Sequence, residues 1–293
     1  MAPQAALLSG GRRLHLQHGP IDLIIGAEGD RDAAFAAART AFAPLLQALV
    51  DELPALRRPP GGARPAGATA ARMDAAVRPF AAAHFITPLA AVAGAVADTV
   101  LAAMREAALL RRAYVNNGGD ISVYLAPGET FRMAMAGAAG ADLGRIAIGA
   151  GDGVGGLATS GHPGRSLSQG IADSVTVLAA SAAEADAAAT LIANAVDLPG
   201  HPAIRRAPAW DCDPSSDLGH RPVVTACGAL PPAAVAAALA AGKARAERFA
   251  AAGMIRGAAL FLRGQSVATD ALIPAQAVAP IQAGASIQAV AHA

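Results

Sequence analysis

One short stretch, YVNNGGDISVYL at residues 114–125, constrains the fold more than any other. Two apolar, β-branched runs lie on either side of the segment NNGGD, residues 116–120. Such runs separated by Asn and Gly are typical of an antiparallel β-hairpin. A plain hairpin needs only Asn-Gly. The second Gly and the Asp therefore indicate a bend whose N–H groups and carboxylate face a ligand, a metal ion or the protein's own backbone.

The rest of the chain repeats this pattern of short β-type runs and adds alanine-rich helical runs. RRLHLQHGPIDLIIGA predicts a hairpin that turns at residues 18–20, and FRMAMAGA, RIAIGAG and DSVTVLAA predict further strands. Helices are expected over 30–53, with a kink at Pro44, and over 89–112 and 181–196. Ser181 and Glu184 match a capping box at the start of the last of these helices. Because the strands cluster in hairpins, we expect an α+β fold with mixed or antiparallel sheets and flanking helices.

The expected domain organisation is simple. Residues 1–270 read as one α+β domain, in which the Pro-, Gly- and Arg-rich segment 54–70 forms a surface loop. Residues 271–293 contain no acidic or basic residue except His292 and show no clear period. We expect this apolar tail to be poorly ordered or to pack only against a partner.

Charge and composition exclude several classes of function. The 23 basic residues nearly balance the 22 acidic residues, so no field gathers nucleic acid or an anionic membrane. Lys243 is the only lysine, which excludes catalysis by a lysine amine elsewhere. Cys212 and Cys227 form no CxxC site and are too few for a disulfide framework.

No membrane span or secretory signal is expected. The longest apolar stretch, residues 80–104, contains His84, Pro88 and Asp98, whereas a span needs about 20 mainly apolar residues. The first residues have no charged region ahead of an apolar core. We therefore expect a cytoplasmic protein.

Asp186 and Thr190 are the first candidate metal ligands. They lie four residues apart in the predicted helix 181–196, so their side chains share one face. A carboxylate and a hydroxyl on one face offer two oxygen ligands to a hard cation such as Mg²⁺. The alternative is a solvent-facing Asp beside an ordinary Thr, and the spacing alone favours that alternative.

The glycine-rich segment 151–170 is a second candidate site. Such backbone approaches phosphate closely, and Arg165 can bind an oxyanion with two N–H groups. GxxxxGK[ST] does not occur there, and a long surface loop is an equal alternative. Ser160 and His162 lack a GxSxG frame and an evident orienting acid, which disfavours a serine hydrolase.

The segment WDCDPSSDLGHR, residues 210–221, places three Asp residues in one loop. It resembles the start of a calcium loop but lacks the Gly at the sixth position and the Glu at the twelfth. A capping or turn role is therefore favoured. The remaining histidines show no HxxxH-type spacing, so a zinc site is not expected.

Four segments resemble, in order, motifs of ApbE-like proteins: AVAGAVAD, YVNNGGDI, GLATSGH and SVTVLAASAAEADAAAT. That family is best known for Mg²⁺-dependent FAD:protein FMN transferases, which attach FMN to a threonine of a target protein. The similarity covers residues 89–196. With LHLQHGPIDLII, FITPLAAVAGAVAD and DPSSDLGHR added, the chain resembles an uncharacterised, cytoplasmic sister family still more closely.

The resemblance implies roles for particular residues, an ApbE-like fold, Mg²⁺ as a cofactor, and FAD or FMN as a ligand. Asp186 and Thr190 match the metal-binding Asp and Thr, and Ala158 matches the residue whose carbonyl joins them. The flavin nucleotide site is matched by the NNGGD turn and the ATSG segment: Asn117, Gly118, Gly119, Asp120, Thr159, Ser160 and Gly161.

The departures from the family pattern leave the activity open. Ala93 stands where the transferases carry Lys, and no His-x-x-Asp-Pro segment follows ATSG. We therefore expect no normal FMN transferase activity. One interpretation is an enzyme, a Mg²⁺-dependent transferase or nucleotide hydrolase, with Asp173, Arg165 and Asp186 as its rebuilt polar groups. Another is a module that binds flavin without turnover, and a third is an active transferase with a rebuilt site. The expected partner is a small-molecule ligand, and homo-oligomerisation stays open.

Overall fold

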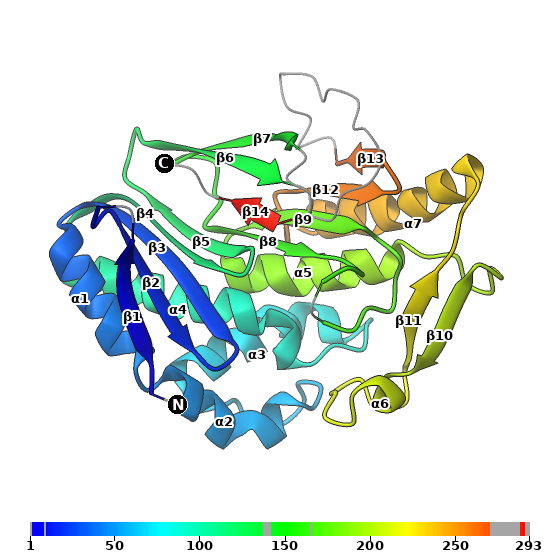
Figure 1. The fold of residues 1–293 in the computed structure, drawn as a ribbon, viewed down its shortest axis with the longest axis horizontal. Coiled ribbons are helices and arrows are strands. Elements are labelled where there is room, and N and C mark those ends of the chain that lie inside the picture. Colours follow the sequence, from blue (N-terminus) through cyan, green and yellow to red (C-terminus); the bar gives the residue numbers. More distant parts are fainter. Residues whose placement is uncertain (1, 9, 137–141, 165, 270–287, 291–293) are drawn as a thin grey trace.

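The main body of the protein is a twisted antiparallel sheet with helices along one face (Figure 1). The computed structural model describes residues 2–8, 10–136, 142–164, 166–269 and 288–290. Within them the sheet has nine strands in the order β1-β2-β3-β4-β5-β8-β9-β12-β13. The strands are β1 Gln4–Leu8, β2 Arg13–His18, β3 Ile21–Gly29, β4 Leu110–Asn117, β5 Asp120–Leu125, β8 Gly156–Ser160, β9 Ser174–Ala179, β12 Gly257–Leu262 and β13 Gln265–Ala268.

The larger apolar core lies between this sheet and the helices. α4 and α5 pack directly beneath the central strands, and α1, α3 and α7 pack against α4 and α5. The helices are α1 Arg31–Phe42, α2 Leu45–Leu56, α3 Ala68–Ala81, α4 Val92–Ala107, α5 Ala182–Ala195, α6 Ala209–Cys212 and α7 Pro232–Ala251, and the 3₁₀ turn η1, Pro88–Ala91, leads into α4.

A second, smaller core covers the opposite face of the sheet. It forms where β6, Thr130–Ala136, and β7, Asp142–Gly149, pack over the central strands. β14, Gln288–Val290, pairs with β6. A separate hairpin of β10, Ile204–Pro208, and β11, Pro222–Cys227, stands at the far end of the molecule from α1 (Figure 1).

Alanine and glycine bring α4 and α5 unusually close. A Cβ placed on Gly94 would lie 2.2 Å from the carbonyl oxygen of Ala182, so a larger residue there would overlap the start of α5. Most of the α5 side chains are small and buried, which lets this helix lie against both β8 and β9. The N-terminal ends of α4 and α5 therefore meet next to the β4–β5 turn.

The predicted α+β class is confirmed, and several local expectations are confirmed with it. The N-terminal hairpin turns at Gly19 and Pro20, and the strand DSVTVLAA is β9, in which all six residues are buried. The helix expected over 30–53 is broken rather than kinked: α1 ends at Phe42, Pro44 precedes α2, and the two helices are bent by 41°. Ser181 caps α5 through its side chain, as the sequence predicts.

Two boundaries were wrong. The helix expected to reach residue 112 ends at Ala107, because residues 110–112 pair with β3 and the ladder outweighs local helix preference. The loop expected over 54–70 is shorter, since α2 continues to Leu56 and α3 begins at Ala68. Pro54 is tolerated because it removes only one hydrogen bond, in the last turn of α2. Of the expected tail 271–293, only Gln288–Val290 belong to the described residues, so that expectation stays a prediction.

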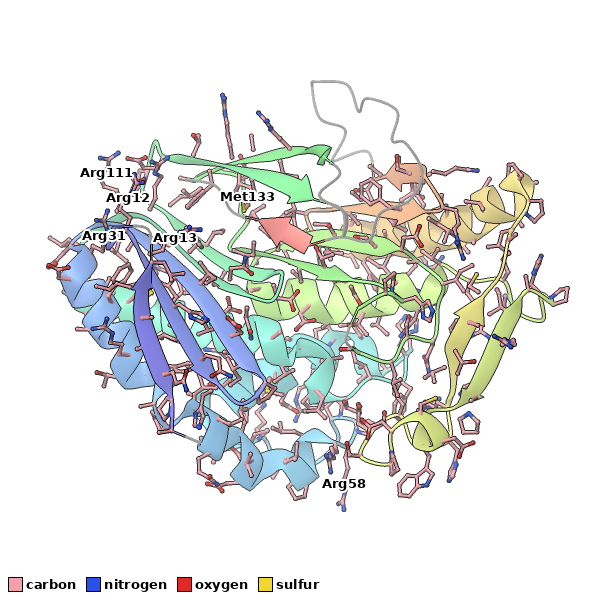
Figure 2. The ribbon with its side chains drawn as sticks, viewed as in Figure 1. Arg12, Arg13, Arg31, Arg58, Arg111 and Met133 are labelled. Atoms are coloured by element: carbon pink, nitrogen blue, oxygen red, sulfur yellow. The ribbon has the colours of Figure 1, made fainter. Side chains whose placement is uncertain are left out.

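Arginines gather at one corner of the sheet, where Figure 2 shows Arg12, Arg13, Arg31 and Arg111 close to the upper ends of β2, β3 and β4. The corner also holds acids: Arg111 and Arg112 pair with Glu129 and Glu28. In the described part of the chain, one helix, Pro88–Ala107, is long and apolar enough to cross a membrane, and the bent pair α1–α2 is a second candidate. More than half of the Pro88–Ala107 window is buried inside the protein, as in the core helix of a soluble fold.

Candidate functional site

The candidate site begins with two carboxylates that cap each other's helices. Asp98 of α4 accepts hydrogen bonds from the backbone N–H groups of Ala182 and Ala183, at 3.1 and 2.9 Å, at the start of α5. Asp186 of α5 accepts one from the N–H of Gly94, at 3.1 Å, in the first turn of α4. Free N–H groups at a helix start carry partial positive charge, so a carboxylate there is stabilised.

The NNGGD segment forms the tight β4–β5 turn beside these helix ends. Gly118 and Gly119 occupy its two loop positions with φ of 66° and 115°, conformations that L side chains rarely adopt. Asn116 accepts from the N–H of Gly119 at 2.9 Å, and Asn117 donates to the carbonyl of Ala93 at 3.1 Å. The amides of the turn therefore bind the protein's own backbone.

Asp120 links the turn to the ATSG segment. Its carboxylate accepts a hydrogen bond from the N–H of Thr159 at 3.1 Å, just beyond the point where the β5–β8 ladder stops at Ile121 and Leu157. The Thr159 hydroxyl lies 2.9 Å from that of Thr176 on β9. Asp120 therefore fixes the end of β8 against the turn.

Asp120 lies close enough to Asp186 for its charge to act on that carboxyl. The pKa of Asp186 is raised well above its usual value, first by burial and next by the negative charge of Asp120. Hydrogen bonds from Gly94 and Ala93 act in the opposite direction. Asp186 keeps some exposed surface, so we expect burial to raise its pKa less than it would raise the pKa of a fully enclosed carboxyl. The repulsion from Asp120 raises the pKa of Asp186 independently of burial.

A second polar cluster lies where β8, β9 and β12 end. Asp173 accepts a hydrogen bond from the N–H of Arg263 at 2.5 Å, in the tight turn between β12 and β13. Burial raises the pKa of Asp173, and burial lowers the pKa of His162. The Asp173 charge opposes the shift of His162, which places the two groups within electrostatic reach. Their pKa values move toward each other, a property suited to proton exchange.

The remaining predicted residues divide between these two clusters. Ala158 is fully buried in β8 opposite Val177, and Thr190 lies one turn beyond Asp186 on α5. A Cβ on Gly161 would lie 2.6 Å from the carbonyl oxygen of Asp173, so Gly161 and Ser160 belong with the His162 cluster. Arg165 lies outside the described residues.

The Asp-rich loop after α6 takes no part in either cluster. Asp213 accepts from the N–H and hydroxyl of Ser215, both at 2.8 Å, which is the turn role that its sequence predicts. Asp217 accepts from the Thr87 hydroxyl at 2.5 Å and so holds the segment that leads into α4. Among the described residues, no group of three or more His, Cys, Asp or Glu side chains is placed to hold a metal ion.

Sequence reasoning missed the partners that complete both clusters. Ser122 donates to Asp98 at 2.5 Å, although it looks like an ordinary strand residue. Arg263 looks like a surface residue, and only Gly264 after it signals the tight turn that brings its N–H to Asp173. His162 stands near Ser160 in the sequence, and no local pattern indicates that Asp173 is its neighbouring acid.

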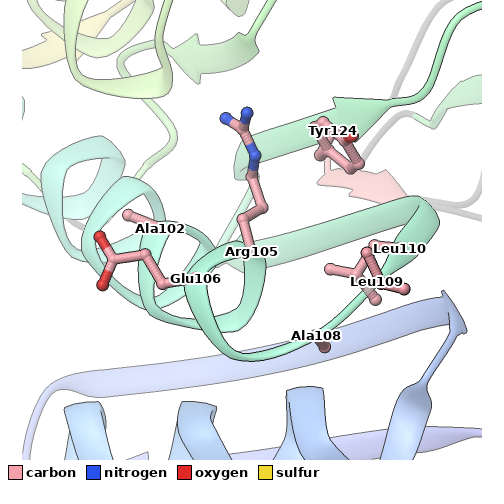
Figure 3. Close-up of a pocket in the computed structure, with 7 residues that line it drawn as sticks. All are labelled: Ala102, Arg105, Glu106, Ala108, Leu109, Leu110 and Tyr124. Carbon is pink, nitrogen blue, oxygen red and sulfur yellow. The ribbon is translucent and has the colours of Figure 1, made fainter.

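A pocket of about 470 Å³ opens at the opposite end of α4 from the capped N-terminus (Figure 3). Arg105 lies over the ring of Tyr124, 4.3 Å from its centroid, and Leu109 is 90% exposed at the rim. This pocket contains none of the residues that the sequence assigns to a site. It therefore does not add to the candidate site.

Comparisons with known proteins place this geometry in a family. A relative from Methanopyrus kandleri, UPF0280 protein MK0206, is 39% identical over 127 residues, which is 42% of this chain and 46% of that protein. The matched region thus spans less than half of this relative. The apo crystal structure of the flavinyl transferase ApbE of Pseudomonas stutzeri is 16% identical with a TM-score of 0.38, over 84% of this chain and 75% of that one. That likeness is too loose to support a conclusion.

The family model provides the decisive match. The model described as AbpE bacteria matches residues 5–268, which include all of the large sheet except Gln4 and both polar clusters. The resemblance to ApbE-like proteins that the four motifs indicate is confirmed by this match. The protein belongs to the AbpE bacteria family.

Proposed function

We propose that the protein binds a flavin or a related phosphorylated heterocycle together with Mg²⁺, and that it lacks normal FMN transferase activity. The observation that supports this most is the pair Asp120 and Asp186. Asp186 accepts a hydrogen bond at the N-terminus of α4, and its pKa is raised first by burial and next by the negative charge of Asp120. A divalent cation between them would remove that repulsion.

The residues around this pair fit a hard cation. Asp186, Asp120, the Thr190 hydroxyl and the Ala158 carbonyl are all oxygen donors, the kind that Mg²⁺ prefers. Mg²⁺ keeps several waters or takes phosphate oxygens, so few protein ligands suffice. When bound, it would neutralise the charge of a ligand phosphate. The protein's own part is to hold the carboxylates in place through Gly94 and Thr159.

The ligand is proposed to lie along the β4–β5 turn and the end of β8. The side chains of Asn117 and Asp120 are engaged by the protein, which leaves backbone and open space for contact with a ligand. A Cβ built on Gly119 would meet nothing within 4 Å, so a flat ring system can approach this position. We therefore propose that the turn and Thr159 line the ligand pocket, and that Ser160 and Gly161 extend it from Thr159 toward the His162 cluster.

A second candidate function, an enzyme with rebuilt chemistry, is favoured by Asp173 and His162. A carboxyl with a raised pKa beside an imidazole with a lowered pKa suits proton transfer. Such a pair would serve a nucleotide hydrolase or a transferase. Arg165, which the sequence places in the same segment, would bind a phosphate of the substrate.

Binding is tested by titrating the purified protein with FAD and with FMN, with and without Mg²⁺, and following flavin fluorescence. We expect Mg²⁺ to tighten binding. Asp186→Asn and Thr190→Val should remove the Mg²⁺ dependence, whereas Asp22→Asn, an exposed carboxylate on β3, should not. Flavin binding that Mg²⁺ leaves unchanged in the wild-type protein would refute the metal part of the proposal. No binding of either flavin would refute the ligand part.

The absence of transferase activity is tested separately. The protein is incubated with FAD, Mg²⁺ and a threonine-bearing acceptor peptide, and the peptide mass is measured. We expect no covalent flavin, because Ala93 replaces the family's Lys and the His-x-x-Asp-Pro segment is missing. A mass increase equal to FMN would establish the third interpretation, an active transferase with a rebuilt site.

A further inference from the structure

A cluster of three basic residues lies between α3, α5 and α7, away from both polar clusters described above. Arg245 and Arg248 are one turn apart on α7, and His84 follows the C-terminal end of α3. Phe249 joins them: its ring centroid is 5.9 Å from that of His84 and 4.8 Å from that of Phe80. α7 lies beside α5 behind β12 (Figure 1).

One buried N–H group of Arg245 lacks a hydrogen-bond acceptor among the described residues. Its Nη1 lies 3.4 Å from the carbonyl oxygen of Leu191 on α5, a long contact. Its Nε is buried and has no hydrogen-bond partner among the described residues. Leaving a buried donor of a charged group without an acceptor is costly, so most such groups in folded proteins are paired.

The cluster also lacks a neutralising acid in the described part of the chain. Burial lowers the pKa of Arg245, and the charge of Arg248 lowers it further. Burial also lowers the pKa of His84, and both arginines add to that shift. Two other partly buried arginines have a carboxylate partner: Arg112 pairs with Glu28, and Arg206 pairs with Asp197. Here the nearest acid on the helix, Glu247, pairs with Lys243 instead.

Helix ends do not explain the arrangement. Arg248 lies in the last turn of α7, where the helix dipole favours a cation. A dipole, however, supplies no acceptor to the buried Nε of Arg245 and does not offset the repulsion between the two arginines. The chemistry that satisfies all three side chains is a compact oxyanion, since arginine binds one with paired N–H groups and a neutral His adds a further donor.

We propose that His84, Arg245 and Arg248 form a binding site for a phosphate group, separate from the flavin and Mg²⁺ site. The phosphate comes either from inorganic phosphate or from a small phosphorylated molecule. Arg245 provides its buried Nε–H group, Arg248 an exposed guanidinium, and His84 a ring N–H. This site does not depend on the proposed function.

The test measures the stabilisation of the whole chain by phosphate at neutral pH and constant ionic strength, with chloride as the replaced anion. Because phosphate also stabilises proteins without binding, by exclusion from their surface, the informative quantity is the difference between variants. We expect a saturable rise in Tm for the wild-type protein and an apparent affinity weaker by about tenfold in Arg245→Gln and Arg248→Gln. Lys243→Gln removes one charge from the same helix outside the cluster and should leave the affinity unchanged.

Two further measurements complete the test. Phosphate should shift the His84 ring signals in the NMR spectrum with the same saturation, which reports contact even if Arg245→Gln alters stability. Adenosine monophosphate is compared with inorganic phosphate: tighter binding of the nucleotide identifies a phosphorylated molecule as the ligand, and equal binding identifies the free ion. A Tm rise equal in wild type and Arg245→Gln, together with unmoved His84 signals, would overturn the proposal.

Discussion

Asp98 and Asp186 each cap the helix that carries the other. Asp98, on α4, accepts the first N–H groups of α5, and Asp186, on α5, accepts an N–H in the first turn of α4. α4 has no capping side chain of its own, so Asp186 supplies from another helix what sequence neighbours usually supply. The candidate site therefore lies at the contact between the N-terminal ends of α4 and α5.

The first prediction concerns Asp98. Asp98→Ala should lower the free energy of unfolding by roughly 2–4 kcal/mol, since two N–H groups of α5 and the Ser122 hydroxyl lose a buried acceptor. Urea denaturation measures the change. Asp51→Ala, which removes an exposed carboxylate from α2, is the matched control and should change the value by less than about 0.5 kcal/mol. A loss as small as the control's would show that the reciprocal cap is not stabilising.

The second prediction is a pH dependence that belongs to Asp186. Because the folded-state pKa lies above the usual 3.8, the folded protein holds this proton more tightly than the unfolded chain does. The contribution of protonated Asp186 to the stability of the folded protein is complete below pH 3.8 and is lost as the pH rises through the raised pKa. The contribution of Asp186 is measured by comparing the free energies of unfolding of the wild-type protein and Asp186→Asn over a series of pH values.

In that series the difference in stability between the two proteins should change with pH above the usual carboxyl range, with the wild type losing more as pH rises. Mg²⁺ added with a phosphorylated ligand should reduce this loss, because the cation favours the ionised carboxylate. Parallel curves for the two proteins would mean that Asp186 titrates as an ordinary carboxyl.

The third prediction tests the contact between α4 and α5 at Gly94. Gly94→Ala places a methyl group 2.2 Å from the Ala182 carbonyl oxygen, and backbone on both sides prevents an easy shift. We expect a loss of about 1–3 kcal/mol or more in the free energy of unfolding. Gly151→Ala, where a Cβ meets nothing within 4 Å, is the control and should be near neutral. Equal stability of the two variants would contradict the close helix contact.

The fourth prediction separates architecture from binding at Gly119. Its φ of 115° disfavours any L side chain, although a Cβ would meet open space. Gly119→Ala should cost about 1–3 kcal/mol in stability through backbone strain alone. Gly61→Ala has open space and no positive φ, so it should be neutral or slightly stabilising. If the folded Gly119→Ala protein keeps its flavin affinity, the turn is architectural only.

The β4–β5 turn shows how far local sequence information extends. Asn116 to Asp120 predicts a tight hairpin, and the structure has one, because positive φ at two glycines is a local requirement. The same residues do not reveal their partners. Asn117 reaches Ala93 and Asp120 reaches Thr159, contacts across 24 and 39 residues of sequence that depend on how helices and strands pack.

The end of α4 shows the opposite case, in which a local pattern misleads. Alanine and leucine continue past Ala107, so the sequence favours helix to residue 112. The edge of β3 offers a ladder of backbone hydrogen bonds to residues 110–112, and this tertiary gain exceeds the small differences in helix propensity.

The sequence by itself determined the α+β class, the hairpins, the Ser181 cap and the family motifs, because each depends on residues close together in the chain. Only the tertiary structure decided that Asp98 and Asp186 exchange caps, that Asp120 repels Asp186, and that Arg263 reaches Asp173. Those relationships arise from long-range packing, in which a carboxylate is placed by a helix or strand far away in sequence. Burial and neighbouring charge then determine its pKa, and neither of them can be predicted from the local sequence.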